Sequence, residues 1–108
     1  MDEKHTLFLK VSGEISPGKH REFEQTIRFI FNNLPSACIS RNLALDVYQK
    51  NLYHMFSMWG SEEGLHAFMA SHEFHLLKGA FMALGEYREA ATGKLVDARL
   101  FDMSDPGT

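Results

Sequence analysis

The sequence contains a single cysteine, Cys38, no block of lysine and arginine residues, and no long apolar run. A lone cysteine cannot form a disulfide within the chain, and the absence of a basic block leaves no electrostatic surface suited to nucleic acid. A membrane-spanning helix needs about 18 or more consecutive apolar residues, and there is no charged-then-apolar leader. We therefore expect a cytoplasmic protein that binds neither nucleic acid nor a membrane.

The residues that are present suit one domain with a substantial core. The chain has 108 residues, with 14 acidic and 11 basic side chains and a formal net charge of -3. We expect a single domain over residues 1–108, with its core at about 5–101 and a polar tail at 102–108. The nine phenylalanines and six methionines suit either a packed core or a pocket for a flat hydrophobic ligand.

The first half of the chain predicts a strand followed by a helix. Apolar residues alternate over residues 5–15, which is typical of a strand. Ser16 then predicts a helix N-cap, with Pro17 at the first helical position. One apolar face follows at helical spacing, and Pro35 ends it; the face comprises Phe23, Ile27, Ile30, Phe31 and Leu34.

The second half predicts a hairpin, a second helix and a last strand. Residues 43–48 and 52–59 are rich in strand formers and are separated by a polar turn at 49–51. A helix capped by Ser61 follows, with a kink or break near Ser71 and an end at Gly85. We expect the last strand at residues 95–101.

The element order β-α-β-β-α-β is that of a ferredoxin-like α+β fold, with an antiparallel four-stranded sheet and both helices on one face. The strands carry apolar residues of both parities, so the other face of the sheet also needs a cover. A second copy of the chain is the simplest cover, and we expect a homodimer through this sheet face.

Two short motifs resemble those of the antibiotic biosynthesis monooxygenase (ABM) family. They are Trp59-x-Ser61-x-Glu63, after the hairpin, and Ser71-His72-x-Phe74 on the following helix. The resemblance covers about residues 5–101. It implies a dimeric α/β barrel in which each subunit keeps a cavity between sheet and helices. Some family members oxidise polycyclic phenols to quinones with O₂ and no prosthetic group, and relatives open the haem ring.

The chain also departs from the family at positions that carry chemistry there. Met55 and Leu65 stand where antibiotic-pathway members have an asparagine and a tyrosine. Phe68 replaces a histidine found in many members, and Lys78 stands at the position of the axial histidine in haem-degrading relatives. A protonated lysine is a poor iron ligand, so a haem role would need to use His75.

The candidate catalytic residues are Trp59, His72 and His75. Trp59 would hold an electron-rich substrate in a water-poor site; the alternative is that it anchors the core where helix and sheet meet. His72 and His75 lie three apart and share a helix face, so either could act as a base toward a phenol; each could also be a solvated residue of the first helical turn. We expect no metal site, because a three-residue spacing without a third ligand does not match a zinc motif.

The residues expected to line the substrate pocket are His54, Phe56, Met58, Phe68, Met69, Phe23 and Ile27. His54 is either a base in that pocket or a hydrogen-bonded sheet histidine. Three functions remain open. The first is a cofactor-free monooxygenase that acts on a small aromatic phenol or quinol. The second is a non-catalytic ligand-binding or dimerisation module, and the third is a haem-binding or haem-degrading protein that uses His75.

Overall fold

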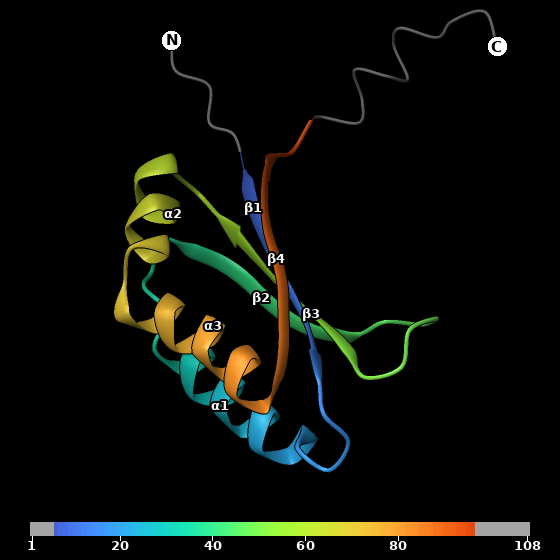
Figure 1. The fold of residues 1–108 in the computed structure, drawn as a ribbon. Helices are drawn as coiled ribbons and strands as arrows, with labels where there is room; N and C mark the ends of the chain where they lie inside the picture. The colour runs from blue at the N-terminus through green and yellow to red at the C-terminus, as the bar shows by residue number, and fades with distance from the viewer. Residues whose placement is uncertain (1–5, 97–108) are drawn as a thin grey trace, which may run out of the picture.

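A computed structural model of the protein describes residues 6–96 (Figure 1). Within these residues the chain forms four strands and three helices in the order β-α-β-β-α-α-β. These elements are β1 (Leu7–Ile15), α1 (His20–Asn32), β2 (Cys38–Leu45), β3 (Leu52–Trp59), α2 (Glu62–Met69), α3 (His72–Leu84) and β4 (Gly85–Lys94).

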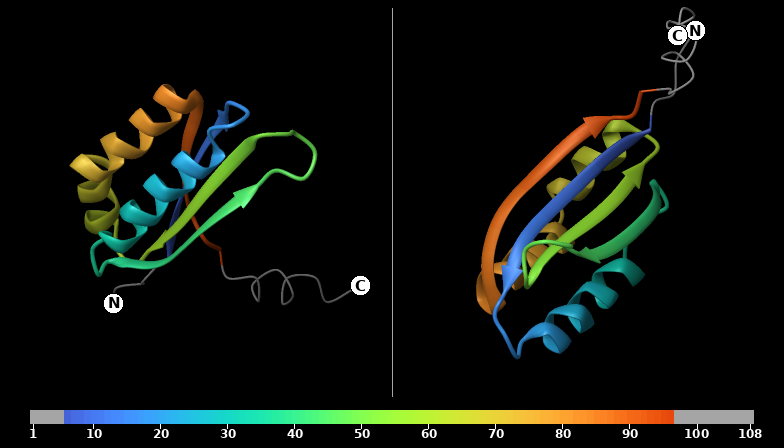
Figure 2. Two further views of the ribbon diagram at one scale, coloured as in Figure 1. Left: turned by 90° about the horizontal axis from the view of Figure 1, so that it is seen from below. Right: turned by 90° about the vertical axis from the view of Figure 1, so that its right-hand side faces the viewer.

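The strands form one antiparallel sheet with the order β2-β3-β1-β4, and the helices cover one face of it (Figure 2). This arrangement confirms the predicted ferredoxin-like fold. Residues alternate between the two faces, so Leu9 and Val11 of β1 are buried under the helices while Phe8 and Lys10 lie on the opposite, open face and are only half-buried.

The predicted break in the second helix is confirmed. Ser61 caps α2 by accepting a hydrogen bond from the Gly64 amide at 3.0 Å. Ser71 caps α3 by accepting one from the Phe74 amide at 3.2 Å. Each serine satisfies a backbone donor that a helix start leaves without an internal partner. The turn between the two helices therefore lies where the second cap residue requires it.

The start of the first helix was predicted wrongly. The helix begins at His20, and Lys19 at its N-terminus makes no side-chain capping bond. Ser16 instead closes a turn, in which its carbonyl accepts from the Lys19 amide at 3.0 Å. Gly18 has a φ of 88°, in the left-handed region that glycine tolerates best, so residues 16–18 form a turn before the helix rather than its first residues.

Two strand positions also differ from the prediction. The second strand is Cys38–Leu45 rather than 43–48, because the Asp46 carboxylate accepts from the amides of Tyr48 and Gln49 and holds these residues in the turn. The last strand is Gly85–Lys94 rather than 95–101. Its register shifts at Ser12 and Gly13, which interrupts the alternation that would have marked it as a strand. Residues 97–101 lie outside the described part of the chain.

The core lies between the sheet and the helices. Phe23 and Phe81 pack with centroids 4.7 Å apart, and Phe23 also packs against Tyr53 at 4.8 Å. Within residues 6–96, no helix is long and apolar enough to cross a membrane.

Candidate functional site

Trp59 and Phe68 stack on each other inside the core. Their ring centroids are 5.0 Å apart, with an interplanar angle of 27°. Trp59 has 0% of its surface exposed and Phe68 has 2%, and the Trp59 indole donates to Ser57 Oγ at 2.8 Å. The Phe68 ring thus occupies the face of the indole on which a substrate was expected to stack. A ligand could reach Trp59 only if this packing opened.

The sheet separates the seven predicted pocket residues, so they do not line one cavity. Phe23, Ile27 and Phe68 are buried on the side of the helices. His54 and Phe56 lie on the open face, as their cross-strand partners Ser12 and Lys10 do, and Met58 follows at the same parity. Met69, the seventh residue, is partly buried at the edge of the helix-covered core.

His72 and His75, two of the predicted catalytic residues, lie in the first turn of α3, and both are exposed. The His75 Nδ1 donates to the Ser71 carbonyl at 2.8 Å. This bond satisfies one ring nitrogen locally and leaves Nε2 as the atom that a substrate or an iron would meet.

A groove of about 400 Å³ lies between α2 and β4, lined by Leu65, His66, Met69, Ala70 and Thr92. Thr92 is the cross-strand partner of the buried Leu9, so it faces the helices. Leu65 belongs to the same core cluster as Trp59 and Phe68. The groove therefore lies at the helix–sheet seam where the sequence predicted a ligand, and its volume falls in the range of small-molecule sites.

Sequence reasoning did not select His66, which supplies the titratable group of this groove. The residue is exposed, one turn before Met69 on α2. Its spacing of three from Met69 was the available signal, because residues three apart share a helix face. The signal was weak, since nothing in the sequence indicates that β4 runs alongside this face.

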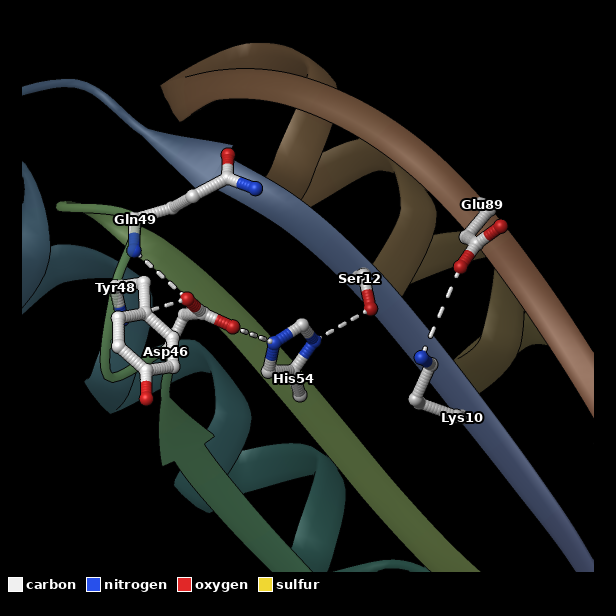
Figure 3. Close-up of polar contacts among 7 residues, drawn as sticks. All are labelled: Lys10, Ser12, Asp46, Tyr48, Gln49, His54 and Glu89. Atoms are coloured by element: carbon white, nitrogen blue, oxygen red, sulfur yellow. Dashed lines mark hydrogen bonds and ion pairs between the residues drawn. The ribbon is translucent and has the colours of Figure 1, made fainter.

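A second polar site lies on the open face, where a chain of hydrogen bonds joins β1, β3 and the turn after β2 (Figure 3). Ser12 Oγ is 2.8 Å from His54 Nδ1, and His54 Nε2 is 2.9 Å from Asp46 Oδ1. The chain borders a pocket of about 350 Å³, lined by Ser12, Gln49, Leu52, His54, Arg88 and Glu89. His54 is thus a hydrogen-bonded sheet histidine beside a pocket, a combination of its two predicted roles.

The hydrogen bond from His54, together with those from the Gln49 and Tyr48 amides, lowers the pKa of Asp46 to about 2. Asp46 is therefore ionised at neutral pH and can only accept hydrogen bonds. It follows that His54 Nε2 carries a proton and donates to Asp46; in the neutral imidazole, His54 Nδ1 then accepts from the Ser12 hydroxyl.

A third polar group lies under α1 and holds the hairpin against that helix. His20 Nδ1 is 2.9 Å from the Tyr53 hydroxyl, and His20 Nε2 is 2.8 Å from Asn51 Oδ1. The Tyr53 hydroxyl donates to Glu24. Burial, followed by the neighbouring Glu24, raises the pKa of Tyr53 well above its ordinary value, so it remains a neutral phenol. Across residues 6–96, no group of three or more potential metal ligands comes together.

Comparison with solved structures supports the fold. No protein-family model and no curated protein matches the chain. A Caulobacter crescentus CB15 protein, named as a candidate antibiotic biosynthesis monooxygenase, is similar with a TM-score of 0.68 and 16% identity over 87% of this chain and 92% of its own.

Two further structures agree. One, named antibiotic biosynthesis monooxygenase, gives a TM-score of 0.64 and 15% identity over 84% of this chain and 97% of its own. A conserved protein of Methanosarcina mazei Go1 gives 0.69 and 14% over 84% and 91%. The chain thus has the fold of proteins that carry the ABM name, as the sequence motifs implied; at these identities the similarity concerns the fold alone.

Proposed function

We propose that the protein is a monooxygenase-type oxidoreductase that oxidises a flat phenol or anthrone with O₂ in the groove between α2 and β4. The observation that supports this is the lining of the groove, in which Leu65, Met69 and Ala70 supply apolar surface beside a single titratable group, His66. An apolar site with one base suits an aromatic substrate that must lose a proton before it reacts.

The chemistry follows from these side chains. A neutral His66 imidazole removes a proton from the activated position of the substrate, and the resulting carbanion transfers an electron to O₂. The substrate radical and superoxide then combine to form a carbon–oxygen bond, and the resulting peroxide takes up the proton held by His66. The oxygen–oxygen bond breaks as the same carbon loses its second hydrogen, so that one oxygen atom remains as the new carbonyl and the other leaves as water. Leu65 and Met69 offer apolar surface to the substrate ring, and the Thr92 hydroxyl is available to hydrogen-bond a substrate oxygen.

The open-face pocket is less suited to this substrate. Besides His54, it is lined by Arg88 and Glu89, whose charges would lose hydration beside an apolar ring system. The stacked pair Trp59 and Phe68 offers no accessible surface. Trp59 therefore supports α2 from within the core in this proposal, rather than contacting the substrate.

An oxygen electrode tests the proposal with a panel of anthrones and quinols. We expect O₂ uptake with the intact protein and a decrease of about 10²–10⁴-fold in His66→Ala, the usual contribution of a general base. His72→Ala is the matched control, since His72 is an exposed helical histidine that does not line the groove. Absence of uptake with the whole panel, or an unchanged rate in His66→Ala, would contradict the proposal.

The second candidate is a non-catalytic module that dimerises through the open face. Two observations favour it: the filled interior at Phe68, and the half-buried apolar residues Phe8, Phe56 and Met58 on the face opposite the helices. Phe8 and Met58 are cross-strand partners, so this apolar surface is continuous. A second copy stacked on it would complete the layer that the sheet lacks.

Sedimentation equilibrium tests the dimer. We expect twice the monomer mass for the intact chain and a monomer for Phe56→Glu, with Phe29→Glu on the outer surface of α1 as the control. A monomeric intact chain would contradict the expected homodimer.

A haem role through His75 predicts a Soret band on mixing with haemin that is lost in His75→Ala.

A further inference from the structure

The hydrogen-bonded chain on the open face has the order that activates a nucleophilic serine. Ser12 lies in the middle of β1, directly opposite His54 on β3. Asp46, which follows β2, lies on the far side of the imidazole (Figure 3). β1, β3 and the turn between β2 and β3 therefore place a hydroxyl, an imidazole and a carboxylate in one line, as general-base activation of a serine requires.

The groups around Asp46 determine that His54 donates to this carboxylate through Nε2. Asp46 Oδ2 accepts from the amides of Tyr48 and Gln49 at 2.9 and 2.7 Å, so this carboxylate is held rigidly. Asp46 Oδ1 faces His54 Nε2 at 2.9 Å, and an ionised carboxylate has no proton to give. With His54 as the neutral imidazole, the Ser12 hydroxyl donates to Nδ1, which is the arrangement needed before that proton can be removed.

The serine also borders space for a substrate. The pocket beside it has a volume of about 350 Å³ and is lined by both Ser12 and His54. Arg88 also lines this pocket, and it pairs through Nη2 with Glu14 at 2.7 Å and through Nε with Glu86 at 3.7 Å. Its guanidinium is the positively charged side chain that this lining offers to the oxygen of an attacked carbonyl.

We propose that Ser12 is a catalytic nucleophile, activated by His54 and Asp46, that hydrolyses small carboxylic esters. Ser12 Oγ forms a bond to the carbonyl carbon while its proton moves to His54 Nδ1. The bond to the alcohol oxygen breaks, and the alcohol leaves with the proton from His54. Water then attacks the acyl-serine by the same route, so the sum is ester plus water giving acid plus alcohol. This site is independent of the α2–β4 groove.

The test must separate covalent chemistry at Ser12 from nonspecific hydrolysis, because exposed histidines such as His66, His72 and His75 also cleave activated esters. A fluorophosphonate probe with intact-mass and peptide mass spectrometry meets this need. We expect one adduct per chain, located on Ser12, and a labelling rate at least about tenfold lower in His54→Ala. The control His72→Ala should label at the rate of the intact chain, and Ser12→Ala should not label.

Asp46 acts through His54, so its role needs a separate measurement. We expect ¹⁵N NMR of the His54 ring to show the Nε2–H tautomer in the intact protein and a tautomer mixture in Asp46→Asn, with slower labelling of Ser12. A folded protein without an adduct on Ser12, or equal labelling of the intact chain and His54→Ala, would overturn the proposal and leave the chain of bonds a cross-strand stabilising contact.

Discussion

Replacing Phe68 by alanine tests whether the helix–sheet interior is filled. Phe68 is 2% exposed, stacks on Trp59 at 5.0 Å and packs edge-on against Phe74 at 5.6 Å. Removing a phenyl ring from such a site costs the transfer free energy of the ring plus the cost of the cavity left behind, together about 3–5 kcal/mol. A domain of this size is stable by only about 5–15 kcal/mol, so the loss is large.

Urea denaturation followed by Trp59 fluorescence measures this loss. Phe29→Ala is the matched control, because Phe29 is 55% exposed on α1 and its truncation should change the free energy of unfolding by no more than about 0.5 kcal/mol. Benzene should bind the cavity of Phe68→Ala, and at 100 times its Kd it should restore about 2.7 kcal/mol.

A cost for Phe68→Ala no larger than that for Phe29→Ala, or equal stabilisation of the intact protein by benzene, would refute the reasoning. Either result would mean that the interior already has room beside Trp59. The cavity that the family resemblance implies would then exist where the structure has packed rings.

Three further predictions concern backbone fit and titration. Gly85→Ala should lower the free energy of unfolding, measured by thermal unfolding, by about 3 kcal/mol or more, because a Cβ at this position would lie 1.8 Å from the Glu14 carbonyl oxygen. A Cβ at Gly79 would have no neighbouring atom within 4 Å, so Gly79→Ala should instead stabilise α3 by up to about 1 kcal/mol. Because folding lowers the pKa of Asp46 from its ordinary value of 3.8 to about 2, the intact chain should be more stable than Asp46→Asn above pH 3.8 and lose this advantage as the pH falls through about 2. Urea midpoints measured across this pH range that showed no such loss would contradict this. Burial raises the pKa of Cys38, so iodoacetamide should alkylate it slowly in the folded protein and rapidly in urea at the same pH, and equal rates would exclude a buried thiol.

The parts of the fold with local signals were predictable from the sequence. The third strand was predicted at residues 52–59, and the structure has it at Leu52–Trp59. Ser61 was predicted as a helix cap and a break was predicted near Ser71, because a serine at a helix start can accept a hydrogen bond from a nearby backbone amide. The antiparallel four-stranded sheet was predicted from the order and type of the elements.

The parts that depend on tertiary contacts were not predictable. The last strand has few strand-forming residues and a register shift against Ser12 and Gly13, so only its pairing with β1 defines it. His66 became a candidate only when β4 was found beside α2, and Ser12 only when β3 placed His54 opposite it. The alternation of side chains along a strand shows that His54 and Phe56 lie on the same face of the sheet. It does not show which of the two faces the helices cover.

The location of the aromatic site is the central claim, and a ¹H–¹⁵N NMR titration with a soluble naphthoquinone tests it most directly. We predict that the largest shifts will occur at the amides of Leu65, His66, Met69 and Thr92, and that Met69→Ala will weaken binding. Shifts centred instead on the first turn of α3 at His75, or on the open face at His54, would contradict the assignment of the α2–β4 groove.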